Sequence, residues 1–430
     1  MSLDLRNFVN INIKYNSTNI SSVERGIVTL ITQNTNFPAD FGTVYSADGF
    51  AAVKKAKSIS DSSLDNYVAS FFGNKGKGLQ IIGGYSTGDV AEWMLGVLKE
   101  LDYKYVIIVS DVSEQVLRSV AAQSPTTKTI VNPLTNTQTV PTFSGLNEKL
   151  FISSTTDTSG KLFNFVSGDS APTWQADTYY SFNSTSGQYE LTTSEPADWS
   201  TDYATYFVVA SSVNASNYII KVGEKGIEML AAAYLSKVRI TDASTIQDYA
   251  FTIENVKAYF PNSVIDDNDT GVALTSAHLN FDTELVNAIR NYPGDMIDGV
   301  DMMNYYIKII LTQDLTESII NLLASKIKFN QTGINRLNNA ISQTMNTYIT
   351  NGYLNTDYIW TEDDLYYSFN GVDYLVCSRN SPLVKGYKCV ILPISSLTAA
   401  QKESHVLPPV YLLLADQTGI RMIVITGDVY

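Results

Sequence analysis

The side chains that most often carry out chemistry are scarce in this sequence. It has two histidines, His278 and His405, and two cysteines, Cys377 and Cys389. Both histidines lie in polar stretches, and no Gly-x-Ser-x-Gly turn accompanies them, so a serine–histidine catalytic arrangement has no support. Two cysteines and two histidines at these separations do not have the spacing of a zinc site. We therefore expect neither a catalytic centre nor a metal site of these kinds.

The two cysteines lie in a strand–turn–strand pattern and could face each other across a hairpin. The first twenty residues lack the basic start and apolar core of a secretory leader, and no apolar run is long enough to span a bilayer. We expect a soluble protein made in a cytoplasm, where thiols stay reduced. Cys377 and Cys389 are then expected to be free, small apolar side chains.

Two loops resemble ligand-binding motifs in part. The stretch GNKGKGL at 73–79 is glycine-rich, but it precedes a strand and lacks the P-loop spacing, which favours a basic surface turn. The stretch DDNDTGVALTSAH at 266–278 has oxygen-bearing residues at the first, third and fifth positions of an EF-hand loop and Gly271 at the sixth. It ends in Ala277 and His278, where a bidentate glutamate is needed. We expect a solvated acidic turn there and no calcium.

Charge and length narrow the functional class further. The 430 residues carry a formal net charge of −14, whereas a general nucleic-acid binder needs a cationic surface. The length allows two or three domains with a sizeable core. Carboxylates are so frequent that no pair is singled out. We predict a non-enzymatic protein with no cofactor and no nucleic-acid partner.

The first third of the chain has the pattern of a parallel α/β sheet. Apolar stretches alternate with helical patterns, the strands at 26–33, 79–84, 103–111 and 149–155 and the helices at 47–59, 63–72, 87–102 and directly after 111. Continuous apolar strands joined by helices predict β-α-β units with right-handed crossovers. Asp89 is placed to cap the third helix.

Residues 155–208 differ in composition from the rest. A third of them are serine or threonine, aliphatic residues are few and aromatic residues are dense. This predicts a small all-β module inserted into the α/β domain. The aromatic residues could form a sugar-binding platform or the core of the module, and we favour the core. They include Trp174, Tyr179, Tyr180, Trp199 and Tyr203.

The last third predicts two long helices followed by strands. One helix runs from near Asp301 to Lys328, with a possible break near 312–314, and the other runs from a cap at Asn330–Thr332 to Gly352. A hairpin with Asn370–Gly371 at its turn comes next. Strand patterns at GYKCVILPI and VYLLLAD follow it.

Both ends of the chain carry strand patterns without a neighbouring hairpin partner. Val9, Ile11 and Ile13 alternate with polar residues, and Met422–Ile425 is a short apolar run. An unpaired strand exposes backbone N–H and C=O groups, so each end is predicted to add to a sheet edge of another copy. Their flanks, 15–22 and 415–420, are predicted to be tethers. Arms that reach neighbouring copies build an open lattice.

Three stretches resemble the contractile-tail sheath proteins of bacteriophages. They are residues 26–75, residues 294–354 with their Gly294–Gly299 and Lys326–Gly333 segments, and the strand-bearing C-terminus. The resemblance covers most of 1–150 and 215–430. It implies a mixed α/β and α+β multidomain fold of the tail-sheath kind, with the small all-β domain inserted and extended strand arms at both ends.

The resemblance also implies a domain plan. It begins with an N-terminal arm and a discontinuous α/β sheath domain, which flanks an outward-facing aromatic insert. An inner C-terminal domain with tube-facing helices and an acceptor sheet follows, and a C-terminal strand arm ends the chain. The corresponding ranges are 1–22, 23–154 with 209–290, 155–208, 291–415 and 416–430.

As a function, the resemblance implies a structural subunit of a phage tail in the virion, made in the host bacterial cytoplasm. Copies would stack as hexameric rings around the tail tube through strand exchange and form a helical polymer. Its contraction would drive the tube through the host envelope for genome ejection. The partners would be other copies, the tube protein, the baseplate and the tail terminator, without membrane insertion. The alternative is a carbohydrate-binding virion or surface adhesin that acts through the aromatic insert.

The resemblance assigns residues to three roles. The strand arms are Val9, Ile11 and Ile13 at one end and Met422, Ile423, Val424 and Ile425 at the other. Acceptor strands are expected at 372–377 and 388–394, with Val372, Tyr374, Val376, Val390 and Leu392. Tube contact is expected from Lys326, Lys328 and Arg336.

Overall fold

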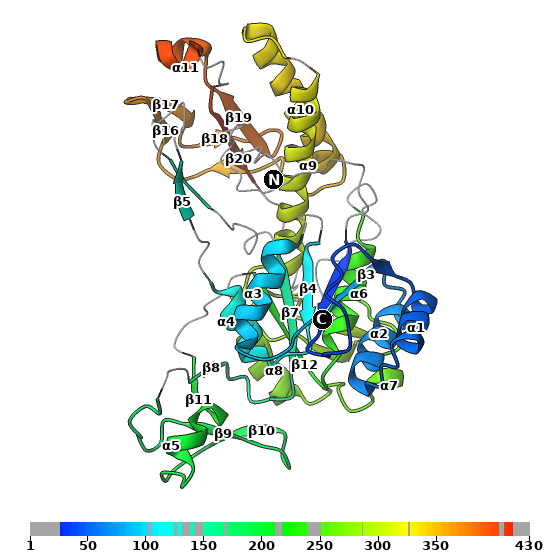
Figure 1. The fold of residues 1–430 in the computed structure, drawn as a ribbon. Helices are drawn as coiled ribbons and strands as arrows, with labels where there is room; N and C mark the ends of the chain where they lie inside the picture. Colours follow the sequence, from blue (N-terminus) through cyan, green and yellow to red (C-terminus); the bar gives the residue numbers. More distant parts are fainter. Residues whose placement is uncertain are drawn as a thin grey trace, which may run out of the picture.

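The computed structural model describes residues 26–101, 105–123, 127–130, 138–141, 149–166, 170–210, 217–239, 251–285, 287–325, 327–403 and 408–415. These residues form an α/β unit, a small β module and a C-terminal unit of two long helices and short sheets (Figure 1). Within these ranges no helix has the length and apolar character needed to span a membrane.

The α/β unit is built on a six-stranded sheet with the order β12-β7-β4-β1-β3-β2. All neighbouring strands are parallel except β2, which lies antiparallel to β3 at the edge. The bounds are β1 Val28–Ile31, β2 Val44–Tyr45, β3 Leu79–Ile82, β4 Ile107–Ser110, β7 Leu150–Thr155 and β12 Tyr218–Val222. The four parallel strands predicted from apolar runs are confirmed. Every residue of β1, β3 and β4 is buried, as expected for strands covered on both faces.

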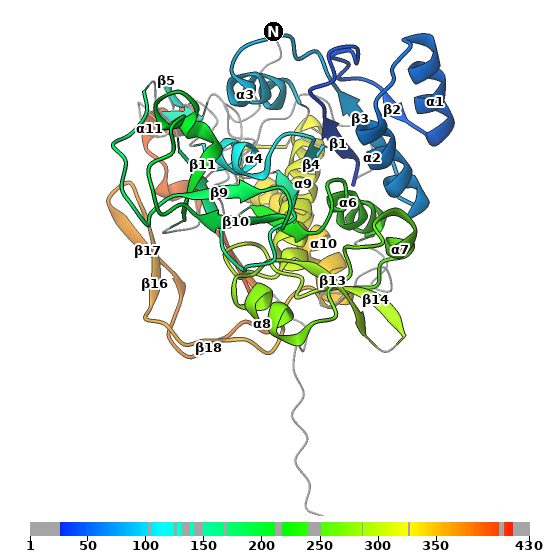
Figure 2. The ribbon, with the colours of Figure 1, turned by 90° about the horizontal axis from the view of Figure 1, so that it is seen from below.

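Helices cover both faces of this sheet. Figure 2 shows α3 (Val90–Glu100) and α4 (Glu114–Ala121) on one side of β1 and β4, and α2 (Ser62–Gly73) and α6 (Glu228–Lys237) on the other. The helix α1 (Ala47–Ala56) packs on the α2 side through Phe50. Side-chain caps start α1 to α4, whereas α6 has none. Asp89 accepts hydrogen bonds from the N–H groups of Ala91 and Glu92, as predicted.

The small module is an antiparallel sheet of four strands in the order β10-β9-β11-β8. Its strands are β8 Phe163–Phe165, β9 Tyr180–Asn183, β10 Gln188–Leu191 and β11 Tyr206–Val209, with a short helix α5 at Trp199–Asp202 and a 3-10 turn at Tyr203–Thr205. Tyr179, Trp199 and Tyr206 are buried in a cluster of their own, and Trp174 packs against it with its ring 5.0 Å from Trp199. The aromatic residues therefore form the core of the module.

A second group of short elements follows the sheet. It contains α7 Val256–Tyr259, α8 Asn268–Ser276 and the hairpin of β13 Phe281–Leu285 with β14 Ala288–Tyr292. The acidic stretch 266–278 is thus a helix rather than the turn that its composition predicts. Asp267 caps this helix by accepting from the N–H of Thr270 at 2.8 Å, and Leu274 is fully buried. Among the described residues, no three His, Cys, Asp or Glu are grouped to hold a metal ion.

The two long helices are α9, Met302–Ala324, and α10, Gln331–Thr350. Their N-caps are Asp301 and Asn330, which confirms both predicted helices. The possible break near 312–314 is wrong, because α9 is continuous for 23 residues. The Thr312 hydroxyl donates a hydrogen bond to the carbonyl of Lys308 at 2.7 Å, and Asp314 accepts a hydrogen bond from Tyr348 on α10.

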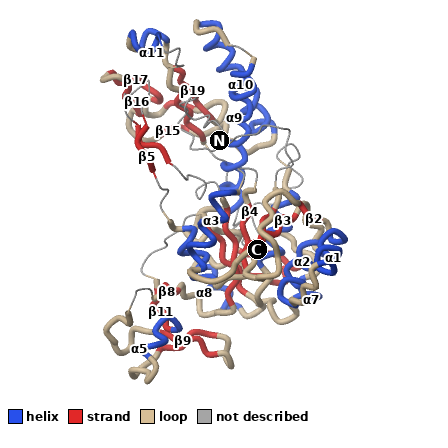
Figure 3. Tube along the Cα trace, in the orientation of Figure 1, coloured by secondary structure: helices blue, strands red, loops and turns tan. Residues whose placement is uncertain are grey.

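Short strands lie beside these helices (Figure 3). They pair as β15 with β18, β16 with β17, and β19 with β20, and a further hairpin joins β5 to β6. The bounds are β5 Thr127–Ile130, β6 Gln138–Pro141, β15 Ile359–Trp360, β16 Leu365–Phe369, β17 Val372–Cys377, β18 Ser381–Pro382, β19 Tyr387–Ile391 and β20 Val410–Leu414. A 3-10 turn, Ile394–Ser396, and α11, Ala399–Glu403, connect β19 to β20. Asn370 and Gly371 both have positive φ at the β16–β17 turn, as predicted.

Candidate subunit interface in the C-terminal unit

The β19–β20 pair, called here the ribbon, is apolar on both faces apart from Lys388. Tyr387 lies opposite Leu414 and Ile391 lies opposite Val410, so the register is fixed along the whole length. Side chains alternate, which places Cys389, Ile391, Leu412 and Leu414 on one face and Val390, Tyr411 and Leu413 on the other. This is the composition of a strand covered on both sides and not of a surface hairpin.

One face of the ribbon packs on the long helices. Tyr387 and Val410 belong to the same core as Ile341, Met345 and Tyr348 of α10. The hydroxyls of Tyr387 and Ser342 also lie 3.3 Å apart, within hydrogen-bond distance. The ribbon is therefore held against α10 by both apolar and polar contacts.

The other face of the ribbon is covered by the β16–β17 hairpin. Val376 and Cys377 of β17 are fully buried in a cluster with Val390, Tyr411 and Leu413. The rings of Tyr367 and Tyr411 are 5.6 Å apart. Helices, ribbon and hairpin thus form three layers with the ribbon in the middle.

The edges of the ribbon, in contrast, have no further strand beside them among the described residues. In the part of the chain that the structure describes, β19 forms a ladder only with β20, and β20 only with β19. Positions 388–391 and 411–414 are accordingly only half-buried although both faces are covered. An open edge presents unpaired N–H and C=O groups in a row and accepts further strands. Each edge of the ribbon can therefore take one further strand.

The residues predicted as acceptors all lie in this unit. Val390 is on β19, and Leu392 follows it and is 1% exposed. Val372, Tyr374 and Val376 are on β17, where β16 occupies one edge. Sequence reasoning recognised the strand at 410–414 but did not assign it as an acceptor, although its unbroken VYLLL run carries the same signal as β19.

Other predicted site residues have mixed outcomes. Both strand arms, with Val9, Ile11, Ile13 and Met422 to Ile425, lie outside the described residues, and so do Lys326 and His405. Lys328 and Arg336 are exposed near the turn between α9 and α10, where Arg336 donates a hydrogen bond to the Ser325 hydroxyl at 2.8 Å. These positions are brought to one end of the helical pair.

The remaining candidate residues are His278 and the two cysteines. His278 follows α8, and its Nδ1 lies 3.1 Å from a carboxylate oxygen of Asp295. Cys377 and Cys389 are free, and burial raises the pKa of the Cys389 thiol to about 11. That thiol is therefore protonated and unreactive at neutral pH.

A buried polar network links the α/β sheet to the start of α9. Asn280 exchanges backbone hydrogen bonds with β12, and its side-chain oxygen accepts from the N–H groups of Gly294 and Asp295 at 2.9 and 3.2 Å. Its amide nitrogen donates to the Asp295 carbonyl at 2.6 Å. The N–H of Met302 then bonds to the carbonyl of Gly294. The direction of α9 is thereby fixed relative to the sheet.

A buried ion pair lies next to this network. Lys221 Nζ lies 2.6 Å from Asp282 Oδ1 and 2.7 Å from Asn291 Oδ1, and both charged side chains are fully buried. Burial lowers the pKa of Lys221 and raises that of Asp282, while their mutual attraction opposes both shifts. Sequence could not identify this pair because its members are 61 residues apart.

No family model matches the chain, and no curated protein matches it. Among solved structures it is similar to the PVC sheath complex of an extracellular contractile injection system, determined by cryo-EM in the contracted state. The TM-score is 0.53 at 9% identity, and the match covers 98% of this chain and 96% of that chain. The chain therefore has the fold of a contractile sheath subunit. The resemblance of its sequence to sheath proteins is confirmed at the level of the fold.

Proposed function

We propose that this protein is the structural subunit of a phage contractile tail sheath. Copies stack as hexameric rings around the tail tube and contract to drive the tube through the host envelope. The observation that carries this proposal is the ribbon, in a chain with a sheath fold. The ribbon is apolar on both faces apart from Lys388 and has no further ladder partner among the described residues. The protein is assigned to the virion after synthesis in the bacterial cytoplasm.

The number of ribbon edges equals the number of strand-like chain ends, which supports strand exchange between copies. The ribbon offers two edges, and the sequence offers two strand-like ends. We assign Val9, Ile11 and Ile13 of one neighbour and Met422–Ile425 of another to those edges. Each added ladder bond contributes about 1 kcal/mol net, so a strand of several residues holds neighbouring copies firmly. The polar tethers at 15–22 and 415–420 let the bodies rotate while the ladders persist.

The folded part of the subunit, without its two arms, is suited to moving as a rigid unit. A single hydrophobic core includes residues of the sheet, of α6, of α9 and α10, and of the ribbon. Contraction that is not driven by nucleotide hydrolysis needs a free-energy gain of only a few kcal/mol per copy. Burial of about 100 Å² of apolar surface on contraction supplies roughly 2.5 kcal/mol. The extended sheath is then a kinetically trapped state that the baseplate releases.

The other partners are assigned by position. The exposed Lys328 and Arg336 near the turn between α9 and α10 are proposed to contact the tube protein, together with Lys326. The aromatic insert is proposed to face outward. The tail terminator closes the far end of the polymer, and the protein neither binds nucleic acid nor enters a membrane.

Negative-stain microscopy of the purified full-length chain tests the proposal. We expect long tubes or stacked rings, and we expect a chain lacking residues 1–16 to remain a folded monomer by circular dichroism and size-exclusion chromatography. A matched pair of variants sharpens the test. Serine at Val9, Ile11 and Ile13 should abolish assembly, whereas alanine at Asn10 and Asn12, on the other face of the same strand, should not. Uniform small particles from the full chain at high concentration would contradict the proposal.

The adhesin alternative has less support. Tyr179 and Trp199 are 6% and 4% exposed, so the strongest aromatic candidates for a sugar platform lie inside the module. An adhesin would form no tubes or stacked rings as the full chain, and removal of residues 1–16 would not change its assembly, which separates the two functions.

A further inference from the structure

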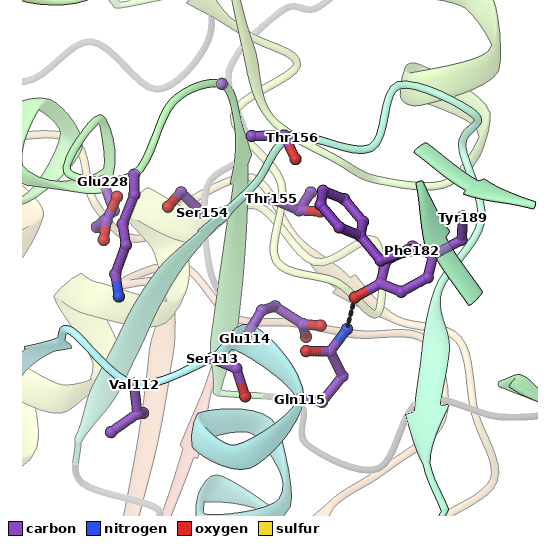
Figure 4. Close-up of a pocket in the computed structure, with 12 residues that line it drawn as sticks. Val112, Ser113, Glu114, Gln115, Ser154, Thr155, Thr156, Phe182, Tyr189 and Glu228 are labelled. Atoms are coloured by element: carbon purple, nitrogen blue, oxygen red, sulfur yellow. Dashed lines mark hydrogen bonds between the residues drawn. The ribbon is translucent and has the colours of Figure 1, made fainter. Parts of the chain in front are cut away.

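A pocket with a volume of about 350 Å³ lies between the α/β sheet and the insert (Figure 4). Three loops that follow β4, β7 and β12 form one side of it. The strands β9 and β10 of the insert form the other side through Phe182 and Tyr189. Its place is notable because ligands of open parallel sheets bind in the crevice at the carboxyl ends of the strands.

The two sides of the pocket are fixed to each other. Gln115 at the start of α4 donates a hydrogen bond to the Tyr189 hydroxyl at 2.7 Å, the bond drawn in Figure 4. Gln188 donates to the Thr158 hydroxyl at 2.8 Å. These bonds hold the insert against the sheet edge, so the pocket is a feature of the folded chain and not a gap between loose parts.

The lining is rich in hydroxyl groups and in buried carboxylates. Ser113, Ser154, Thr155 and Thr156 supply hydroxyls, each of which can donate and accept. Glu228 is 1% exposed and accepts from the Tyr67 hydroxyl at 2.7 Å and from the N–H of Gly226 at 2.9 Å. The Ser154 side chain and a further backbone N–H also hydrogen-bond to this carboxylate. The four acceptor positions of Glu228 are therefore occupied within the protein.

Aromatic side chains of the insert form the remaining wall of the pocket. Phe182 is 47% exposed, far more than the rings in the core of the module, and its ring packs against Tyr189 at 5.3 Å. An apolar ring that is left open beside hydroxyls and carboxylates is suited to a ligand with one apolar face and a polar rim.

We propose that this pocket binds a neutral saccharide. Sugar hydroxyls can exchange hydrogen bonds with the serine and threonine hydroxyls of the lining, while a C–H face of the ring packs on Phe182. A wholly apolar ligand would leave the lining hydroxyls unpaired, which costs free energy. An anion would face the carboxyl groups of Glu114 and Glu228, and both nearby cations already have partners. Arg118 is paired with Glu114, and Lys225 donates to the Asp111 carbonyl. The inference does not depend on the sheath function.

Saturation-transfer NMR and calorimetry on the full-length protein test it, with D-glucose, D-galactose, N-acetyl-D-glucosamine and inorganic phosphate as probes. We expect at least one sugar to bind in the millimolar range and phosphate not to bind. The variants Phe182→Ala and Thr156→Val should each weaken sugar binding by about tenfold. The control Val209→Ala, at a strand residue of the same module that is 43% exposed and outside the pocket, should change nothing.

Three results would overturn the proposal: no binding of any of the three sugars, binding of phosphate in their place, or equal sugar binding by both variants and the parent chain. Thr156 is exposed, so Thr156→Val keeps the test valid if Phe182→Ala fails to fold. Microscopy of the same variants keeps the two proposals separate, because both should assemble like the parent chain.

Discussion

At the scale of single residues, the buried pair of Lys221 and Asp282 makes the sharpest prediction. In Lys221→Met the carboxylate of Asp282 would lie fully buried without its cation, and its Oδ2 already has no hydrogen-bond partner among the described residues. Breaking such a pair typically costs about 3–5 kcal/mol. We expect the free energy of unfolding at neutral pH to fall by about that amount, measured by urea titration.

The sign of the pH dependence follows from the raised pKa of Asp282. A buried carboxyl with a raised pKa binds its proton more tightly in the folded chain than in the unfolded chain. The stability deficit of Lys221→Met should therefore shrink as the pH falls from neutral toward the ordinary aspartate pKa. The matched control is Lys257→Met, which removes an exposed pair with Glu284 and should cost less than about 1 kcal/mol. A deficit that grows on acidification would contradict the assignment.

At the scale of elements, the open edges of the ribbon predict a change in amide exchange. In unassembled protein, outward N–H groups of 387–391 and 410–414 have no ladder partner among the described residues, so these peptides should exchange quickly. In assembled tubes the added strands should slow that exchange by at least about tenfold. The strand β1 has a neighbour on each side and should be protected in both states. Equal exchange of the ribbon peptides before and after assembly, by mass spectrometry, would refute strand addition.

Elements set by local signals could be predicted from sequence, and those set by distant contacts could not. The caps Asp301 and Asn330 and the unbroken apolar runs of β1 and β4 are local, so α9, α10 and four strands of the sheet were foreseeable. The strands β2 and β12 were not predicted. The helix α8 was not, because Asp, Asn and Gly favour turns and the burial of Leu274 outweighs that preference. The two-sided covering of the ribbon and the pocket beside Phe182 are tertiary and left no sequence signal beyond apolar runs and aromatic content.

At the scale of the whole molecule, the insert is separable from the body. Its core of Tyr179, Trp199 and Tyr206 is a cluster distinct from those on either face of the sheet. The N–H of Ala210 donates to the carbonyl of Leu162 at 2.6 Å, so the two ends of the module lie side by side. The module can therefore be replaced by a short Gly-Ser linker between these two residues without stretching the sheet.

This replacement predicts two opposite outcomes from one variant. The ribbon and the two arms remain, so the shortened chain should form tubes with the same helical repeat but a smaller outer diameter, measured by cryo-EM. It lacks Phe182 and Tyr189, so it should bind none of the sugars. A folded, shortened chain that fails to assemble would show that the insert takes part in subunit contact and does not merely decorate the outside. Retained sugar binding would place the saccharide site elsewhere on the body, because only the sheet side of the pocket survives the deletion.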